Sequence, residues 1–579
     1  MDRKQLEDRL RLSLKLSHAV RDAAEAAETF RSQCNQVKLL SVSISRALFR
    51  AVPVVASSGT AYLRPFHRIL SSLDASLSRS LPLLRRCRSR RRPLLRLLVS
   101  FSAPSAFPRS LSLLSASLAE LSWLIDVYSD GRAREEPNSI DTVLARVWTN
   151  VAAIEMGVGD PAESATALAE VALLGPRNKD LVVEEGGVPP LLGLLVTVES
   201  ASTAAATALY NLSDDADRVS VIAMHGGVQI IAKKMFESSS MRTQSVLASL
   251  VSRMAGGVPG LAEEFGREGL TELLIHFLSM DLELEMDSNR SPSLQWEFPE
   301  MMGEENPKTE VKLKIDCAEA LCVLIRHSDS NCRQVANPQA LLCLAKIIET
   351  EKAEEDEKLK VNCLSILALI AVASEDNHEL RRVTFKMSSF ATKAIVEQLL
   401  HVIEAFISSP ESMILAIRSL GSLARIFPTK ESLRVVKPLV HRLGDRAPGV
   451  AVEAVVALCK FTSPENFNCV EHSKAIIDSE GVVPLMRLLR PGEPAQVPAL
   501  TLLCYLAINV SGSETLERVR TLNTLQVAYR SSATVRSPQL KELIMKAILK
   551  MRGNSRELMY SSQVSNFDPS FDFRMYSVI

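Results

Sequence analysis

The sequence contains few aromatic residues: Phe, Trp and Tyr make up 5% of its 579 residues, whereas apolar residues make up 47%. This composition favours layers of buried α-helices over aromatic-rich β-sandwiches. No CxxC pair occurs among the ten cysteines, and nearly all of them lie in apolar helical patterns. We therefore expect free thiols in a reducing compartment rather than a disulfide framework.

Long hydrophobic runs are lacking as well. The first residues, MDRKQLEDRL, are charged and do not resemble a secretory signal peptide. No uncharged apolar run reaches the roughly 18 residues of a membrane-spanning helix. We expect a cytoplasmic protein, with the periphery of the plasma membrane and the nucleus as alternative locations.

Motifs of catalysis and of cofactor or metal binding are also absent. The sequence contains no HExxH, GxSxG or kinase signature, and its nine histidines are scattered singly. Cys317, Cys322, Cys332 and Cys343 have no metal-binding spacing, so core packing is the better interpretation. We expect no enzymatic activity, no cofactor and no bound metal.

Charge is balanced overall but unevenly distributed. Residues 1–130 contain 21 Lys+Arg and 10 Asp+Glu, a net charge of 21 − 10 = +11, so the remainder carries −11. A basic head on an acidic body favours an anionic surface or partner for the head.

A leucine inside a helix rich in small residues recurs along the acidic body. The intervals between these leucines are 38 to 53 residues, except for one of 71 that contains the polar segment 281–310. A helical period of about 40–47 residues is typical of armadillo and HEAT repeats. The recurring positions are Leu168, Leu209, Leu250, Leu321, Leu367, Leu420, Leu458 and Leu503.

Glycine turns interrupt the repeats, as in LVVEEGGVPPLLGLL and IIDSEGVVPLMRLL. Glycine permits the positive φ of a sharp turn, and proline is tolerated in the first helical turn that follows. A phosphate-binding loop is the alternative, but neither GxGxxG nor GxxxxGK[ST] is present. We interpret five glycines as structural hinges: Gly186, Gly187, Gly226, Gly227 and Gly481.

These patterns predict an all-α protein with an N-terminal four-helix-bundle-like domain followed by an armadillo-type α-solenoid, a right-handed superhelix of about eight repeats. We expect the bundle in residues 1–130, a linker in 131–140, repeats in 141–280 and 311–552, and a disordered tail in 553–579. Residues 281–310 contain nine acids and two bases, which predicts a flexible acidic insertion. Its apolar island WEFPEMM either docks on the solenoid or binds a partner.

Several segments resemble known families. ALYNLSDDADRVSVIAMHGGVQIIAKKM resembles an armadillo repeat, and VKLKIDCAEALCVLIRHSDSNCRQVANPQALLCLAKIIE is similar to the plant armadillo-repeat-only family. The head segments YLRPFHRIL and LAELSWLIDV resemble the N-terminal helical domain of that family. The resemblance implies a role in polarised cell growth. It also implies protein partners among the Rho-of-plants GTPases or their GTPase-activating proteins.

The segment LLRRCRSRRRPLLRLL is the most basic part of the head. It is either a solvated helix end or a site for anionic membrane lipids, because polybasic segments gain about 1 kcal/mol per Lys or Arg near an acidic leaflet. Nuclear localisation is a further alternative, and we expect no nucleic-acid partner. The arginines are Arg85, Arg86, Arg88, Arg90, Arg91, Arg92 and Arg96.

A partner groove is expected on the helices that follow the glycine turns, because a solenoid presents a long concave surface. Its candidate residues are Lys233, Lys234, His441, Arg442 and Arg487; the alternative is that they are exposed residues without a role. The expected function is a non-catalytic scaffold that binds proteins. The alternatives are an adaptor in ubiquitination without a U-box of its own, or a nuclear transport receptor, which the absence of a tryptophan array disfavours.

Overall fold

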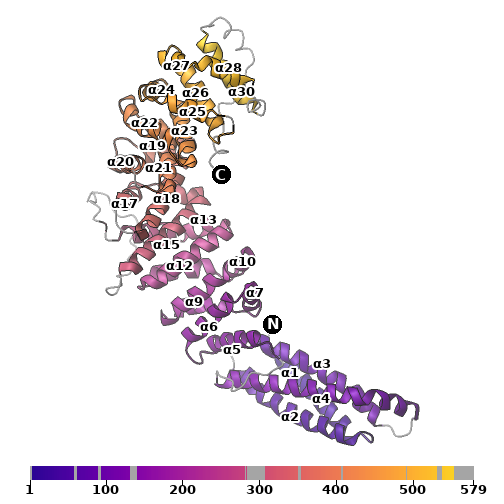
Figure 1. Cartoon of the computed structure of the whole chain (residues 1–579). Helices are drawn as coiled ribbons and strands as arrows, with labels where there is room; N and C mark the ends of the chain where they lie inside the picture. Colours follow the sequence, from indigo (N-terminus) through magenta and orange to yellow (C-terminus); the bar gives the residue numbers. More distant parts are fainter. Residues whose placement is uncertain are drawn as a thin grey trace. The chain divides into compact units, whose positions relative to one another are not determined.

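A computed structural model describes most of the chain (Figure 1). The described residues are 3–57, 62–88, 93–130, 140–197, 199–280, 282, 307–349, 354–405, 408–490, 492–530 and 537–552. These residues form α-helices and short 3-10 helices, and none of them belongs to a β-strand. Their contacts divide into two compact units, one up to Val258 and one from Pro259 onward. The division falls ahead of the insertion expected at 281–310.

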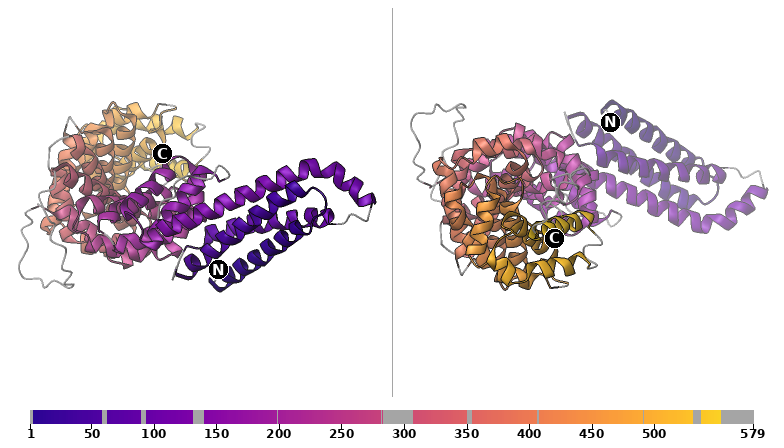
Figure 2. Two further views of the ribbon diagram at one scale, coloured as in Figure 1. Left: turned by 90° about the horizontal axis from the view of Figure 1, so that it is seen from below. Right: turned by 90° about the horizontal axis from the view of Figure 1, so that it is seen from above.

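The head of the first unit is a bundle of four helices (Figure 2). Helix α1 packs against α2 and α3, and α4 packs against α2 and α3. Apolar residues at helical spacing, such as Phe66, Ile69 and Leu73, form its core. Polar contacts join the helices as well, and the Ser13 hydroxyl donates to Asp74 at 2.6 Å. The helices are α1 (Arg3–Glu25), α2 (Arg31–Ser57), α3 (Arg64–Cys87) and α4 (Pro93–Asp130).

One stretch of α4, Ala106–Ser129, is long and apolar enough to cross a membrane by length and composition. A core helix of a soluble protein passes the same test. In the bundle this stretch contributes the buried side chains of Phe107, Leu114, Leu121 and Leu124 to the core.

Helices α5 to α12 complete the first unit. The long helices α6, α9 and α12, rich in small residues, stack on one another in sequence order, while α8 packs against α11. The bounds are α5 (Thr142–Met156), α6 (Pro161–Leu173), α7 (Pro176–Glu184), α8 (Val188–Thr197), α9 (Glu199–Leu212), α10 (Ala216–Met224), α11 (Gly227–Glu237) and α12 (Met241–Gly257).

The second unit repeats this arrangement. Its long helices α15, α18, α21, α23 and α26 form one stack, and α14, α17, α20 and α22 follow one another beside it. The bounds are α13 (Gly260–Arg267), α14 (Leu270–Ser279), α15 (Pro307–Arg326), α16 (Asp329–Val335), α17 (Pro338–Glu349), α18 (Glu354–Asp376), α19 (His378–Thr384), α20 (Phe390–Glu404), α21 (Pro410–Ser422), η1 (Ala424–Ile426), η2 (Thr429–Glu431), α22 (Ser432–His441), η3 (Arg442–Gly444), α23 (Pro448–Thr462), α24 (Cys469–Asp478), α25 (Val482–Leu488), α26 (Gln496–Asn509), α27 (Glu514–Arg518), α28 (Thr521–Tyr529) and α30 (Pro538–Met551).

The recurring leucines mark the cores of these repeats. Each of them lies in a different long helix and is at most 1% exposed. Side chains also bind backbone carbonyls of the preceding repeat: the Asn211 amide donates to Ala169 O at 3.1 Å, and the Asn466 amide donates to Ala424 O at 3.1 Å. Such bonds satisfy carbonyls near helix ends and fix one repeat on the next.

The glycine turns have two positions with different requirements. Gly186 and Gly226 have positive φ values of 86° and 77°. The residue after each needs space instead, because a Cβ on Gly227 would lie 2.6 Å from Ile222 O. In the IIDSEGVVPLMRLL turn, Glu480 takes the positive φ, 62°, and Gly481 has a φ of −66°. The hinge prediction therefore needs a correction at Gly187, Gly227 and Gly481, which are required for close approach and not for a positive φ.

The expected insertion and tail are largely outside the described residues. Helix α14 ends at Ser279 and α15 begins at Pro307, so α15 starts within the segment 281–310. Residues 283–306, the linker residues 131–139 and the tail 553–579 lie outside the described part of the chain.

Candidate functional site

The first repeat is joined to the head by a buried carboxylate. Glu185, 8% exposed, accepts a hydrogen bond from the Trp148 indole N–H at 2.8 Å and one from Arg68 at 2.7 Å. The Arg68 guanidinium also lies 5.8 Å from the centre of the Trp148 ring. Arg64 donates to the carbonyl of Glu184, and a Cβ added at Gly186 would lie 3.3 Å from the Arg64 guanidinium carbon. The turn EEGG thus binds α3 of the head as well as linking α7 to α8.

A cavity of about 540 Å³ lies beside this junction. Ile69, Leu144, Trp148 and Leu181 supply apolar lining, and Arg68, Glu120, Asp141 and Arg177 supply charged groups of both signs. Its volume is within the range of ligand pockets. The charges of the lining balance, so the cavity has no clear preference for an anion or a cation.

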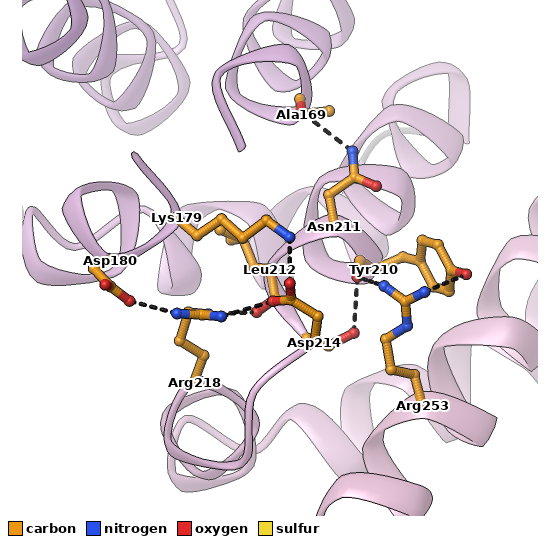
Figure 3. A network of polar contacts seen from close by, with 10 residues as sticks. Ala169, Lys179, Asp180, Tyr210, Asn211, Leu212, Asp214, Arg218 and Arg253 are labelled. Carbon is orange, nitrogen blue, oxygen red and sulfur yellow. Dashed lines mark hydrogen bonds and ion pairs between the residues drawn. The ribbon is translucent and has the colours of Figure 1, made fainter. Parts of the chain in front are cut away.

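A polar network ties α7, α9 and α10 together (Figure 3). Asp214 binds Lys179 at 2.5 Å and Arg218 at 2.7 Å, and Arg218 also binds Asp180 at 2.5 Å. Burial opposes the ionisation of Asp214, but hydrogen bonds from Lys179 and Arg218 outweigh it and lower the pKa of its carboxyl. These charges pair with one another, so we interpret the network as one that stabilises the packing of these helices.

The long-helix face, defined here by Leu173 of α6, Tyr210 of α9 and Arg253 of α12, combines side chains suited to binding, with Leu173 exposed and the other two half-buried. The Arg253 guanidinium carbon lies 3.8 Å from the centre of the Tyr210 ring, and Arg253 donates to Tyr210 O at 3.2 Å (Figure 3). Leu173 is 69% exposed. It lies one helical turn after Ala169 on α6, and the carbonyl oxygen of Ala169 accepts the hydrogen bond from the Asn211 amide. The sequence patterns do not single out these residues.

The structure describes only part of the predicted cluster of arginines in the head. Arg85, Arg86 and Arg88 are exposed at the C-terminal end of α3, the favourable end of a helix for cations. Arg90, Arg91 and Arg92 lie outside the described residues, and Arg96 lies in α4 without a described side chain.

The predicted groove residues fall into two groups. Lys234 is 5% exposed and binds Glu199, and Arg442 donates to Ile403 O at 2.7 Å and to Ala405 O at 3.0 Å, so both hold neighbouring helices together. Lys233, His441 and Arg487 are exposed.

The exposed groove candidates are only partly brought together. His441 and Arg487 lie in successive repeats of the second unit, where α25 contacts η3 directly after His441. Lys233 belongs to the first unit and pairs along its own helix with Glu237 at 3.7 Å.

Two family models match parts of the chain. Residues 175–214 match the armadillo/beta-catenin-like repeat, which covers α7, α8, α9 and the turn between α7 and α8. Residues 7–129 match a family described as a domain of unknown function (DUF7792). None of the curated proteins matches the chain. The chain is thus an armadillo-like repeat protein with an all-α, armadillo-type solenoid.

Solved structures of three engineered proteins are similar to parts of the chain. A crystal structure of an engineered protein from the Northeast Structural Genomics Consortium is 20% identical, with a TM-score of 0.46, and the match covers 71% of this chain and 99% of that one. Two further engineered proteins are 20% and 18% identical, with TM-scores of 0.35 and 0.37. Each of these covers 49% of this chain, and 97% and 99% of its own length respectively.

Proposed function

We propose that this protein is a non-catalytic scaffold that binds partner proteins on the long-helix face of its first unit. The observation that carries the proposal is the exposed Leu173 of α6 together with the half-buried pair Tyr210 and Arg253 of α9 and α12, three helices that stack in sequence order. Tyr210 lies within the repeat that matches the armadillo model. Among the described residues, no group of His, Cys, Asp and Glu side chains could hold a metal ion.

The chemistry of this face suits a protein partner. Tyrosine and arginine are enriched in the residues that contribute most to protein interfaces. The Tyr210 ring and Arg253 guanidinium hold one another in place, so less side-chain entropy is lost when a partner binds. Leu173 adds an exposed apolar side chain on α6, the helix that packs against α9.

The experiment compares two full-length variants that change equally exposed residues of the same unit. Leu173→Glu places a charge on the long-helix face, and Met224→Glu places one on α10, where Met224 is 75% exposed. Loss of a co-purifying partner with the first variant but not the second supports the proposal. Equal retention of all partners by both variants excludes this face.

The identity of the partners and the cellular role are proposed from the family resemblance. We propose that the partners belong to Rho-of-plants GTPase signalling, through the GTPases or their activating proteins, and that the role lies in polarised growth. The exposed Arg85, Arg86 and Arg88 support attachment of the head to anionic lipids at the plasma membrane. Binding of the purified chain to such GTPases and to anionic vesicles tests these two proposals separately.

A further inference from the structure

Cys34 and Cys87 form a pair of buried thiols in the head bundle. Cys34 lies in the first turn of α2, and Cys87 is the last residue of α3. The two residues are 1% and 0% exposed, and each thiol influences the pKa of the other. They are 87 − 34 = 53 residues apart in the sequence, so the fold of the bundle brings them together.

The turn between α1 and α2 holds this pair from both sides. The backbone N–H groups of Glu28 and Thr29 donate to the carbonyl oxygen of Cys87 at 3.0 and 3.2 Å, and the Thr29 hydroxyl donates to it at 3.1 Å. The Cys34 thiol donates to the Thr29 carbonyl at 3.7 Å. Thr29 therefore contacts both cysteines and fixes the N-terminal turn of α2 against the end of α3.

The pKa values of the two thiols are shifted in opposite directions. A hydrogen bond from Cys34, with a further one from Thr29, outweighs burial and lowers the pKa of Cys87 to about 7. The same hydrogen bond and burial raise the pKa of Cys34. In contrast, burial raises the pKa of Cys317 and of Cys363. Since the thiolate is the reactive form, Cys87 is the better nucleophile of the pair.

We propose that Cys34 and Cys87 are a redox-active pair that closes a reversible disulfide when a small peroxide oxidises the head. The Cys87 thiolate attacks one oxygen of hydrogen peroxide and becomes a sulfenic acid, and the departing hydroxide takes up a proton to form water. Cys34 then attacks the Cys87 sulfur and displaces hydroxide, which takes the Cys34 proton and forms a second water. Two thiols and one peroxide thus yield one disulfide and two waters.

The disulfide would tie the first turn of α2 to the last turn of α3. That turn carries Arg85 and Arg86 and is followed by Arg88. Closing a loop of this length removes conformational entropy from the unfolded chain, so the oxidised bundle should melt at a higher temperature than the reduced bundle.

The test treats the folded full-length protein with hydrogen peroxide, blocks remaining thiols with iodoacetamide and identifies peptides by mass spectrometry. We expect one cross-linked pair containing Cys34 and Cys87, two hydrogens lighter than the reduced peptides. Dithiothreitol should reverse the link, and the melting temperature of the oxidised head should rise by several degrees. Cys317 and Cys363 should remain unoxidised and serve as internal controls.

A variant distinguishes the order of the two steps. In Cys34→Ser, the Cys87 sulfenic acid should persist and be trapped by dimedone, with no cross-linked peptide. The proposal is overturned if both thiols of the wild-type protein stay open to alkylation after peroxide treatment and unfolding. It is equally overturned if the link forms only when peroxide is added to the urea-unfolded chain.

Discussion

The indole N–H of Trp148 donates to the carboxylate of Glu185 at 2.8 Å, inside the junction between the first repeat and the head. This bond unites the first armadillo turn with α5, and Arg68 extends it to α3. Removal of the carboxylate leaves the buried indole N–H without its acceptor, which typically costs about 1–3 kcal/mol.

Substitution of Glu185 should loosen the head from the repeats. We expect Glu185→Ala to lower the free energy of unfolding by about 2 kcal/mol, and Glu185→Gln to have a smaller effect because an amide oxygen can still accept from Trp148. Urea unfolding followed by tryptophan fluorescence measures both. Glu184→Gln is the control, since that residue contributes only its backbone carbonyl. Equal stability of Glu185→Ala and Glu184→Gln would argue against a structural role for the carboxylate.

The glycine turns predict opposite effects for two similar substitutions. Gly227→Ala would place a Cβ 2.6 Å from Ile222 O and 2.7 Å from Ile222 Cγ2, so the variant should lose about 2 kcal/mol or more of stability. Gly193→Ala meets no atom within 4 Å on α8 and should be neutral or gain up to about 1 kcal/mol. Thermal unfolding of both variants checks the sign. A harmless Gly227→Ala would show that the turn can adjust.

His472 should make the second unit sensitive to acid. It is fully buried against Phe461, at 5.0 Å between ring centres, and burial lowers its pKa to about 4. An unfolded histidine has a pKa of about 6.5, so the unfolded chain binds the proton more readily. The free energy of unfolding should therefore fall as pH drops from about 6.5 to about 4, by up to about 3 kcal/mol.

A non-titrating residue at this position should remove that pH dependence. We expect His472→Leu to flatten the stability profile between pH 6.5 and 4, measured by urea unfolding at several pH values. The exposed His441, changed to Leu, is the matched control. If His472→Leu and wild-type protein lose stability in parallel, another group is responsible.

The exposed arginines at the end of α3 should govern binding to anionic vesicles. Changing Arg85, Arg86 and Arg88 together to Gln should weaken vesicle binding about tenfold. This figure assumes that each lost charge reduces the binding free energy by about 0.5 kcal/mol, half of the usual contribution near an acidic leaflet. The bundle should still fold, since surface substitutions usually change stability within about 0.5 kcal/mol each. A triple Gln variant at the exposed Arg46, Arg79 and Arg109 controls for net charge. Equal loss in both variants would indicate a general charge effect.

The sequence predicts the fold better than the site. The periodic pattern of apolar residues predicts which face of each helix is buried, as at Leu209 and Leu458. The spacing of these leucines predicts the repeat length. The positive φ of Glu480 could not be predicted from the sequence, because residues other than glycine rarely adopt a positive φ. The role of Gly481 therefore became clear only from the contacts of its backbone.

Contacts between distant segments were the main features that the sequence did not reveal. Lys234 and Arg442 are basic residues near a predicted groove, but each meets an acceptor from another repeat and is directed inward. Tyr210 and Arg253 are 43 residues apart. That separation is close to one repeat, so a search for side chains at equivalent positions of successive long helices could have found the pair.

The affinity of the full-length protein for its partners is the measurement that tests the scaffold account most directly. Quantitative pull-down should compare wild-type protein, Leu173→Glu and Met224→Glu at equal expression and equal melting temperature. The account predicts that a partner is lost at least tenfold with Leu173→Glu and retained with Met224→Glu, because a buried, unpaired charge at an interface centre costs more than 1.4 kcal/mol, about a factor of ten in affinity. Unchanged binding by Leu173→Glu would contradict it.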